Sequence, residues 1–138
     1  MIKRVNQKKK KGFSLIELII VLAVMAIIAL IAIPNFTAVR ENSKVKADLR
    51  TCETIQKTVL MLVSDETITG TEDILYDGET PLEADDVDGL ENKNPSETRD
   101  IHVILNEALS GVNKPQGKST TAYKIAITDG TVEVTPES

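Results

Sequence analysis

Residues 13–33 read FSLIELIIVLAVMAIIALIAI, an apolar run of 21 residues with one charged side chain, Glu17. Roughly 20 apolar residues are enough for a helix to cross the hydrocarbon core of a bilayer. Four consecutive lysines, at positions 8–11, come directly before the run. By the positive-inside rule they place the N-terminus in the cytoplasm. The stretch therefore predicts a single-pass membrane helix, with the rest of the chain outside.

The charge of the chain is divided unevenly along its length. The 138 residues include 16 basic and 21 acidic side chains, a net charge of −5. Residues 1–12 hold six bases and no acid, whereas residues 13–138 hold 10 bases and 21 acids, a net charge of −11. An acidic body repels phosphate, and four aromatic residues offer few stacking platforms, so we expect no nucleic-acid partner.

Cysteine and histidine are each present once, as Cys52 and His102. This excludes an internal disulfide and a multi-cysteine or His-cluster metal site, and it leaves few options for acid–base catalysis. No phosphate-binding glycine loop or nucleophile motif occurs. We therefore expect no enzyme and no cofactor.

Three interpretations of the apolar run compete. A cleaved secretory signal peptide has a shorter apolar region, of roughly 7–15 residues, and ends near a small-residue site such as Ala-x-Ala, which is absent here. A plain membrane anchor leaves Glu17 unexplained. A charged side chain costs about 2.5–3.5 kcal/mol at the centre of a membrane helix and less near its end. The next charge along the chain is Arg40, so the third interpretation gives Glu17 a partner in another molecule.

The octapeptide that opens the run, Lys11-Gly-Phe-Ser-Leu-Ile-Glu-Leu18, resembles the prepilin-peptidase motif of type IV pilins. The resemblance covers about residues 8–60. It implies that residues 1–12 are a basic leader, cleaved after Gly12, and that Phe13 becomes an N-methylated N-terminus. It assigns filament assembly to Glu17. The proline that follows the run, Pro34, also matches the family.

The resemblance implies a structural subunit of a type IV pilus, or fimbrium. Such a subunit is a single-pass prepilin in the cytoplasmic membrane and becomes part of a helical homo-oligomeric filament on the cell surface. The implied partners are a prepilin peptidase, an assembly ATPase and a platform protein. Adhesion, twitching motility and secretion are roles of the family. The alternative is a pseudopilin of a type II secretion or DNA-uptake (competence) system, because these proteins share the motif. A membrane-anchored binding module or enzyme that keeps residues 1–12 is a hypothesis of another class.

The chemistry of the motif agrees with this assignment. Cleavage after Gly12 creates an α-ammonium at Phe13, which is as costly in hydrocarbon as a lone carboxylate. Glu17 of one subunit can neutralise Phe13 of its neighbour when the helices stack with an axial offset, so that assembly relieves two desolvation penalties. The same pair is sterically feasible within one subunit, at i and i+4. Glycine at position 12 is small enough to extend into a protease site.

One helix is predicted from about residue 14 to residue 63. Pro34 lies inside it and is expected to kink it. After the proline the pattern becomes amphipathic. The apolar stripe of this second half consists of Val45, Leu49, Cys52, Ile55, Val59, Leu62 and Val63. We expect Cys52 to be a buried, inert thiol.

Residues 64–97 hold twelve acids and one base, with few apolar side chains, and we interpret them as an irregular, solvated acidic connecting loop. Within it, Asp86, Asp88 and Glu91 form a weak candidate for a calcium site, because alternating acids before a glycine can wrap a hard cation. The full EF-hand spacing is absent, so a solvated loop is the competing interpretation.

The remainder predicts an α+β headgroup of the type IV pilin kind. A short second helix is expected over Thr98–Leu109, capped by Ser96 or Thr98 and closed by Gly111, with His102 as a structural or surface residue. A hairpin is expected from residues 123–128 and 131–135 around Asp129-Gly130. A third strand near residues 74–76 or 118–122 completes a small antiparallel sheet on the long helix. The expected domains are the leader (1–12), a filament-core helix (13–36) and the headgroup (37–138).

Overall fold

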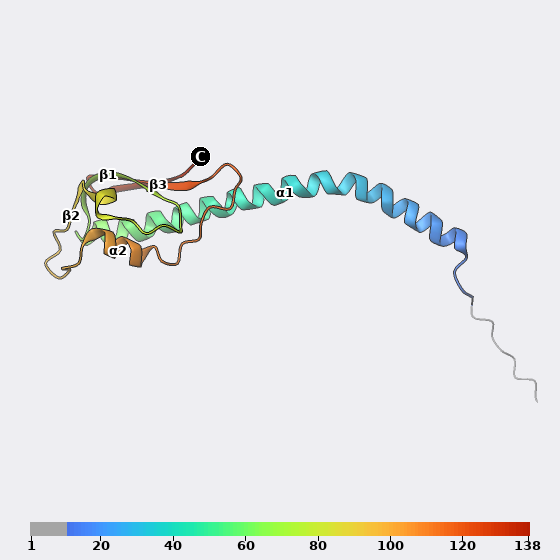
Figure 1. Ribbon diagram of the computed structural model, residues 1–138, viewed down its shortest axis with the longest axis horizontal. Coiled ribbons are helices and arrows are strands. Elements are labelled where there is room, and N and C mark those ends of the chain that lie inside the picture. The colour runs from blue at the N-terminus through green and yellow to red at the C-terminus, as the bar shows by residue number, and fades with distance from the viewer. Residues whose placement is uncertain (1–10) are drawn as a thin grey trace, which may run out of the picture. The chain divides into compact units, whose positions relative to one another are not determined.

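The computed structural model describes residues 11–138 of the chain (Figure 1). Residues 1–10 of the predicted leader lie outside this described part. The chain divides into two compact units, of which the first ends at Val39 and the second is Arg40–Ser138. The helix α1 (Leu15–Ser64) runs through both units. It confirms the long helix predicted for residues 14–63, whereas the predicted domain boundary after residue 36 stays a prediction.

The second unit contains a four-stranded sheet in which every neighbouring pair is antiparallel, in the order β2-β1-β3-β4. Its strands are β1 (Thr69–Tyr76), β2 (Leu90–Glu91), β3 (Ala122–Thr128) and β4 (Thr131–Glu137). The turn between β3 and β4 has φ values of 39° at Asp129 and 91° at Gly130. A two-residue type I′ turn requires positive φ at both positions, so the predicted hairpin is confirmed.

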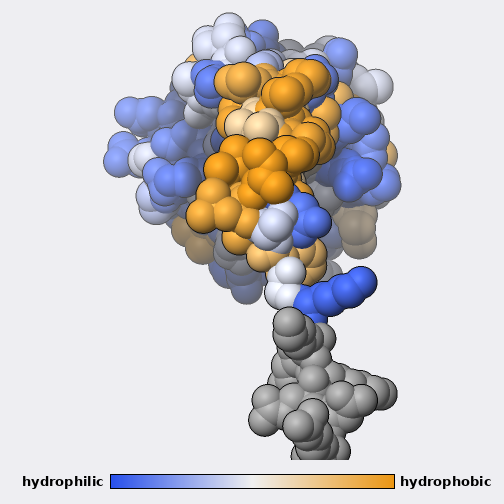
Figure 2. All heavy atoms as spheres, turned by 90° about the vertical axis from the view of Figure 1, so that its right-hand side faces the viewer, coloured by the Kyte–Doolittle hydropathy of each residue, from blue (hydrophilic) through white to orange (hydrophobic). Residues whose placement is uncertain are grey.

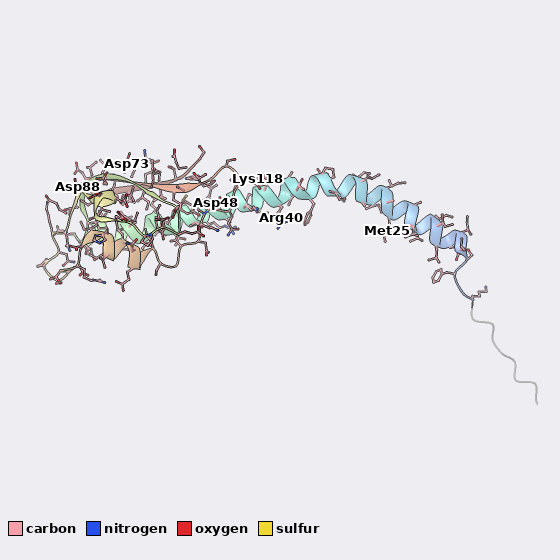
Figure 3. The ribbon with its side chains drawn as sticks, in the orientation of Figure 1. Met25, Arg40, Asp48, Asp73, Asp88 and Lys118 are labelled. Atoms are coloured by element: carbon pink, nitrogen blue, oxygen red, sulfur yellow. The ribbon has the colours of Figure 1, made fainter. Side chains whose placement is uncertain are left out.

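The strand β1 lies inside the acidic stretch that we predicted to be irregular, and this part of the prediction is wrong. It pairs Ile74 with Ile125 and Tyr76 with Tyr123 of β3. Alternation buries Ile74 and Tyr76 on one face, while Asp73 on the other face forms an ion pair of 2.9 Å with Lys124 (Figure 3). The third strand is therefore the one predicted near residues 74–76. Of the other candidate, residues 118–122, only Ala122 is in a strand.

The second helix, α2 (Ile101–Ala108), begins later than the predicted Thr98. The Glu97 carboxylate accepts hydrogen bonds of 3.0 Å from the backbone N–H groups of Thr98 and Arg99, which hold this segment in a turn. Hydrogen bonds from Arg99 lower the pKa of Glu97 to about 2. The N-cap is Asp100, so the predicted capping by Ser96 or Thr98 is wrong. Gly111 lies beyond the C-cap, Leu109.

The second unit has three layers: the sheet, the C-terminal half of α1 and α2. In Figure 1, α1 runs between the other two, and one cluster of buried side chains forms the core. The largest fully buried core residues come from β3, β1, α1, and α2 with its C-cap. They include Tyr123, Ile125, Ile127, Ile74, Ile55, Val59, Leu105 and Leu109. Cys52 is 4% exposed, and burial raises the pKa of its thiol. The prediction of a buried cysteine is confirmed.

The predicted apolar stripe of α1 is wrong at two positions. Val45 is 42% exposed and Leu49 is 48% exposed, while Asp48 between them is 2% exposed. The inward face of the helix continues through Asp48 because it lies four residues before Cys52 and seven before Ile55, on the same side of the helix. A carboxylate thus occupies a core position.

Asp48 fastens a loop of the headgroup to α1. Its Oδ1 accepts a hydrogen bond of 2.8 Å from the backbone N–H of Gln116, and its Oδ2 accepts one of 2.8 Å from Gly117. About two helical turns before Asp48, Glu41 Oε1 accepts a hydrogen bond of 2.7 Å from the backbone N–H of Lys118. Figure 3 shows Asp48 on α1 and Lys118 on the loop next to it. We refer to Glu41 and Asp48 with residues 116–118 as the carboxylate clamp.

Candidate functional site

The predicted cleavage position lies in an open segment before α1. Residues 11–14 are outside any helix or strand, and all four are exposed. Phe13 is 86% exposed. A Cβ atom added at Gly12 would meet no atom within 4 Å. No residue of the described part of the chain covers the bond between Gly12 and Phe13, so this bond is accessible to an enzyme.

A capping box starts the helix directly after this segment. The Ser14 hydroxyl oxygen accepts a hydrogen bond of 3.3 Å from the backbone N–H of Glu17, and Glu17 Oε2 accepts one of 3.1 Å from the backbone N–H of Ser14. The Ser14 carbonyl accepts the first helical bond, from Leu18. This reciprocal pair satisfies two backbone donors that a helix start otherwise leaves free.

This role of Ser14 was not among our predictions. The signal was present, because Ser-x-x-Glu before an apolar run is the signature of a capping box. The finding changes the interpretation of Glu17, whose carboxylate both caps its own helix and carries the one negative charge of the apolar run. Within residues 11–138 Glu17 forms no ion pair.

The first half of α1 is apolar on every side. Each residue from Leu15 to Val39 is exposed in the chain as described. Figure 2 shows hydrophobic side chains gathered over the surface of the N-terminal segment. Among residues 11–138, α1 is the one helix that is long and apolar enough to cross a membrane. A surface of this kind needs lipid or partner helices to cover it.

Pro34 does not interrupt the helix, which continues through it to Ser64. A proline has no backbone N–H, so the carbonyl four residues earlier, at Leu30, has no helical donor from this position. The Thr37 hydroxyl donates a hydrogen bond of 2.8 Å to the Pro34 carbonyl. The expected kink itself stays a prediction.

The weak calcium candidates do not converge on one site, and only Asp86 and Glu91 have side-chain contacts. Asp86 Oδ2 accepts a hydrogen bond of 2.8 Å from the backbone N–H of Glu83, Asp88 is the C-cap of the short helix η1 (Ala84–Val87), and Glu91 lies 3.8 Å from Lys93 Nζ. Across the described residues, no group of three His, Cys, Asp or Glu side chains is arranged to hold a metal ion. His102 is half-buried on α2, beside a surface pocket that Arg99 and Asp100 also line.

Comparison with known proteins agrees with the N-terminal site. A family model described as "Prokaryotic N-terminal methylation motif" matches residues 7–33. The "Prepilin peptidase-dependent protein A" of Clostridium perfringens (strain 13 / Type A) is 36% identical over 62 residues. The aligned part is 45% of this chain and 44% of that relative, so the chain spans less than half of the relative's length. No solved structure matches the chain.

These findings agree on the class of the protein. The chain carries the N-terminal methylation motif, and its long helix on a small antiparallel sheet with a short second helix is consistent with the type IV pilin fold. The motif and the relative support a type IV pilin-like or pseudopilin protein. The motif and the apolar helix also fit membrane anchoring.

Proposed function

We propose that this chain is the structural subunit of a type IV pilus filament. It is inserted in the cytoplasmic membrane as a prepilin with its N-terminus inside, cut between Gly12 and Phe13, methylated on Phe13, and polymerised through α1 into a surface filament. The observation that carries the proposal is the order of three features. An open glycine–phenylalanine bond is followed by a capped helix start, and then by a fully exposed apolar helix with one carboxylate.

The energetics of this arrangement favour assembly. The apolar half of α1 is covered by lipid before assembly and by neighbouring helices afterwards. After cleavage, the α-ammonium of Phe13 lies at the membrane edge of the same helix that carries Glu17. Pairing this ammonium with Glu17 of a neighbour removes two uncompensated charges from the hydrocarbon. Assembly then requires no catalytic residue in the subunit, and we propose that the chain is not an enzyme.

The partners follow from these steps. A prepilin peptidase must cut the leader, and the name of the Clostridium perfringens relative includes dependence on such an enzyme. We further propose an assembly ATPase and a membrane platform protein, which supply the work of extracting the helix from lipid. A pseudopilin of a secretion or DNA-uptake system is the alternative, since it has the same N-terminal chemistry. Long fibres sheared from the cell surface favour the pilin, and short assemblies within the envelope favour the pseudopilin.

Replacing Gly12 by valine is expected to block processing. A branched side chain at this position obstructs an extended backbone in a protease site, so the uncut chain should accumulate in membranes when a prepilin peptidase is co-expressed. The ratio of uncut to cut chain is measured by intact mass. An added Cβ at Gly12 meets no atom of the chain within 4 Å, so a loss of cleavage would report on the peptidase and not on the chain's own fold.

Gly111→Val is the matched control, because an added Cβ at Gly111 also meets nothing within 4 Å. It should be processed as completely as the unmodified chain. Equal processing of Gly12→Val and the unmodified chain would place the cut elsewhere and contradict the assignment of Gly12.

A further inference from the structure

The outward face of α1 in the second unit carries cations that form no ion pair with any residue of 11–138. Lys46, Arg50 and Lys57 follow one another at spacings of four and seven residues, which places them on one side of a helix. That side is opposite the buried face of Asp48 and Ile55, and it also carries the exposed Glu53, so its net charge is +2. All three cations are exposed, and none forms an ion pair among residues 11–138. We refer to these three residues as the basic face.

Residues 61–138 differ in this respect, because their cations are mostly paired. Lys93, Arg99, Lys114 and Lys124 each lie within 4.0 Å of a carboxylate. Their acids are nevertheless in large excess, since residues 61–138 hold 5 bases and 17 acids whereas residues 40–60 hold 5 bases and 3 acids. Among the described residues from 40 onward, most of the unpaired positive charge is thus on α1 and most of the unpaired negative charge is on residues 61–138.

The basic face continues into exposed apolar surface at the end of α1. Met61 is 72% exposed and Leu60 is 40% exposed, and together with Lys57 they line a surface hollow. Apolar side chains beside charged ones are typical of a protein interface with a hydrophobic centre and a polar rim. A site for nucleic acid would lack the apolar part and would suffer the repulsion of the acidic headgroup.

The densest unpaired negative charge is in residues 83–88, which we call the acidic turn. It holds Glu83, Asp85, Asp86 and Asp88, all exposed. Glu83 and Asp86 cap η1 reciprocally. The carboxylates of Asp85 and Asp88 form no hydrogen bond or ion pair within the described chain, and are free to meet a cation from outside (Figure 3 labels Asp88).

We propose that a second copy of this chain covers the basic face, with its acidic turn against Lys46, Arg50 and Lys57. Charge complementarity between the two surfaces selects the copy and its orientation, because opposite potentials steer encounter and like charges penalise other arrangements. The inference rests on the proposed filament and adds to it a specific lateral contact outside the membrane segment. It requires no rearrangement of either surface, since both are already exposed.

Charge reversal in the full-length chain tests the proposal. Lys57→Glu is expected to lower the yield of sheared filaments about fivefold or more, by replacing attraction with repulsion at every repeat. Lys118→Glu is the matched control. It makes the same change of charge at an exposed lysine that forms no ion pair among the described residues and lies off the basic face. Only the backbone N–H of Lys118 takes part in the carboxylate clamp, and the substitution keeps it, so the yield should stay within about twofold of normal.

The decisive variant combines Lys57→Glu with Asp85→Lys in one chain, which restores opposite charges across each contact and should recover the filament yield. Equal yields from Lys57→Glu and Lys118→Glu would overturn the inference, as would a failure of the double variant to recover. If the amount of the Lys57→Glu chain in the membrane fraction fell in parallel with its filament yield, the inference would also be overturned. The lower yield would then come from a lower amount of protein and not from weaker docking. Absence of filaments from the unmodified chain would instead overturn the proposed function, and this inference with it.

Discussion

Replacing Glu17 by glutamine is expected to lower the yield of sheared filaments about 100-fold while the amount of chain in the membrane stays normal. Glutamine preserves the capping box, because its side-chain oxygen can still accept the Ser14 N–H bond that Glu17 accepts at 3.1 Å. It removes the negative charge. In the filament the Phe13 ammonium of the neighbour is then buried unpaired among apolar helices. The cost is up to about 2.5–3.5 kcal/mol, the value for a charge at the centre of a membrane helix, which corresponds to about two factors of ten.

Two further variants separate the roles of this carboxylate. Ser14→Ala removes the cap and keeps the charge, so it should cost about 1 kcal/mol of helix stability and reduce the yield far less than Glu17→Gln. Glu17→Ala removes both the cap and the charge. All three are compared by immunoblot of the sheared and membrane fractions. Filaments at normal yield from Glu17→Gln would show that the charge is dispensable and that Glu17 acts as a helix cap alone.

Replacing Asp48 by alanine is expected to destabilise the headgroup by about 3–6 kcal/mol. The Asp48 carboxylate accepts two hydrogen bonds of 2.8 Å from backbone N–H groups, and each charge-assisted bond of this kind contributes about 1.5–3 kcal/mol. Alanine leaves both donors without an acceptor. Because Asp48 is 2% exposed, water is a poor substitute for the lost acceptor. The loop of residues 116–118 should therefore detach from α1 near position 48.

Unfolding by urea measures this effect in the full chain in detergent. Tyr76 and Tyr123 are both buried in the core of the headgroup and the chain has no tryptophan, so tyrosine emission follows the headgroup and not the membrane helix. Gly117→Ala should also destabilise it, because the added Cβ would lie 2.9 Å from Asp48 Oδ2. Glu53→Ala is the control, an exposed carboxylate on the same helix. Equal unfolding midpoints for Asp48→Ala and Glu53→Ala would contradict the clamp.

Features that depend on neighbouring residues were predictable from the sequence. The apolar run specifies α1 because length and hydropathy suffice for a membrane helix, and Asp129-Gly130 specifies its hairpin because both residues tolerate positive φ. The capping box of Ser14 and Glu17 was equally readable and was missed. It is a pattern of four residues, and we interpreted Glu17 through its charge alone.

Features that depend on distant parts of the chain were not predictable in this way. Asp48 is polar and lies outside the predicted apolar stripe, but the loop at Gln116 and Gly117 supplies two donors that make its burial favourable. The strand β1 is acidic, and it is held by pairing Ile74 and Tyr76 with β3 roughly fifty residues later in the chain. The late start of α2 follows from the Glu97 side chain, which takes the backbone donors of Thr98 and Arg99.

Whether the chain is processed and assembled is shown by N-terminal sequencing, combined with the intact mass, of the protein in material sheared from whole cells. We expect a chain that begins at Phe13, carries one added methyl group and is recovered from sheared fibres. A chain that begins at Met1, is absent from the sheared fraction and remains in membranes would contradict cleavage and filament assembly together, and would leave α1 as a plain membrane anchor.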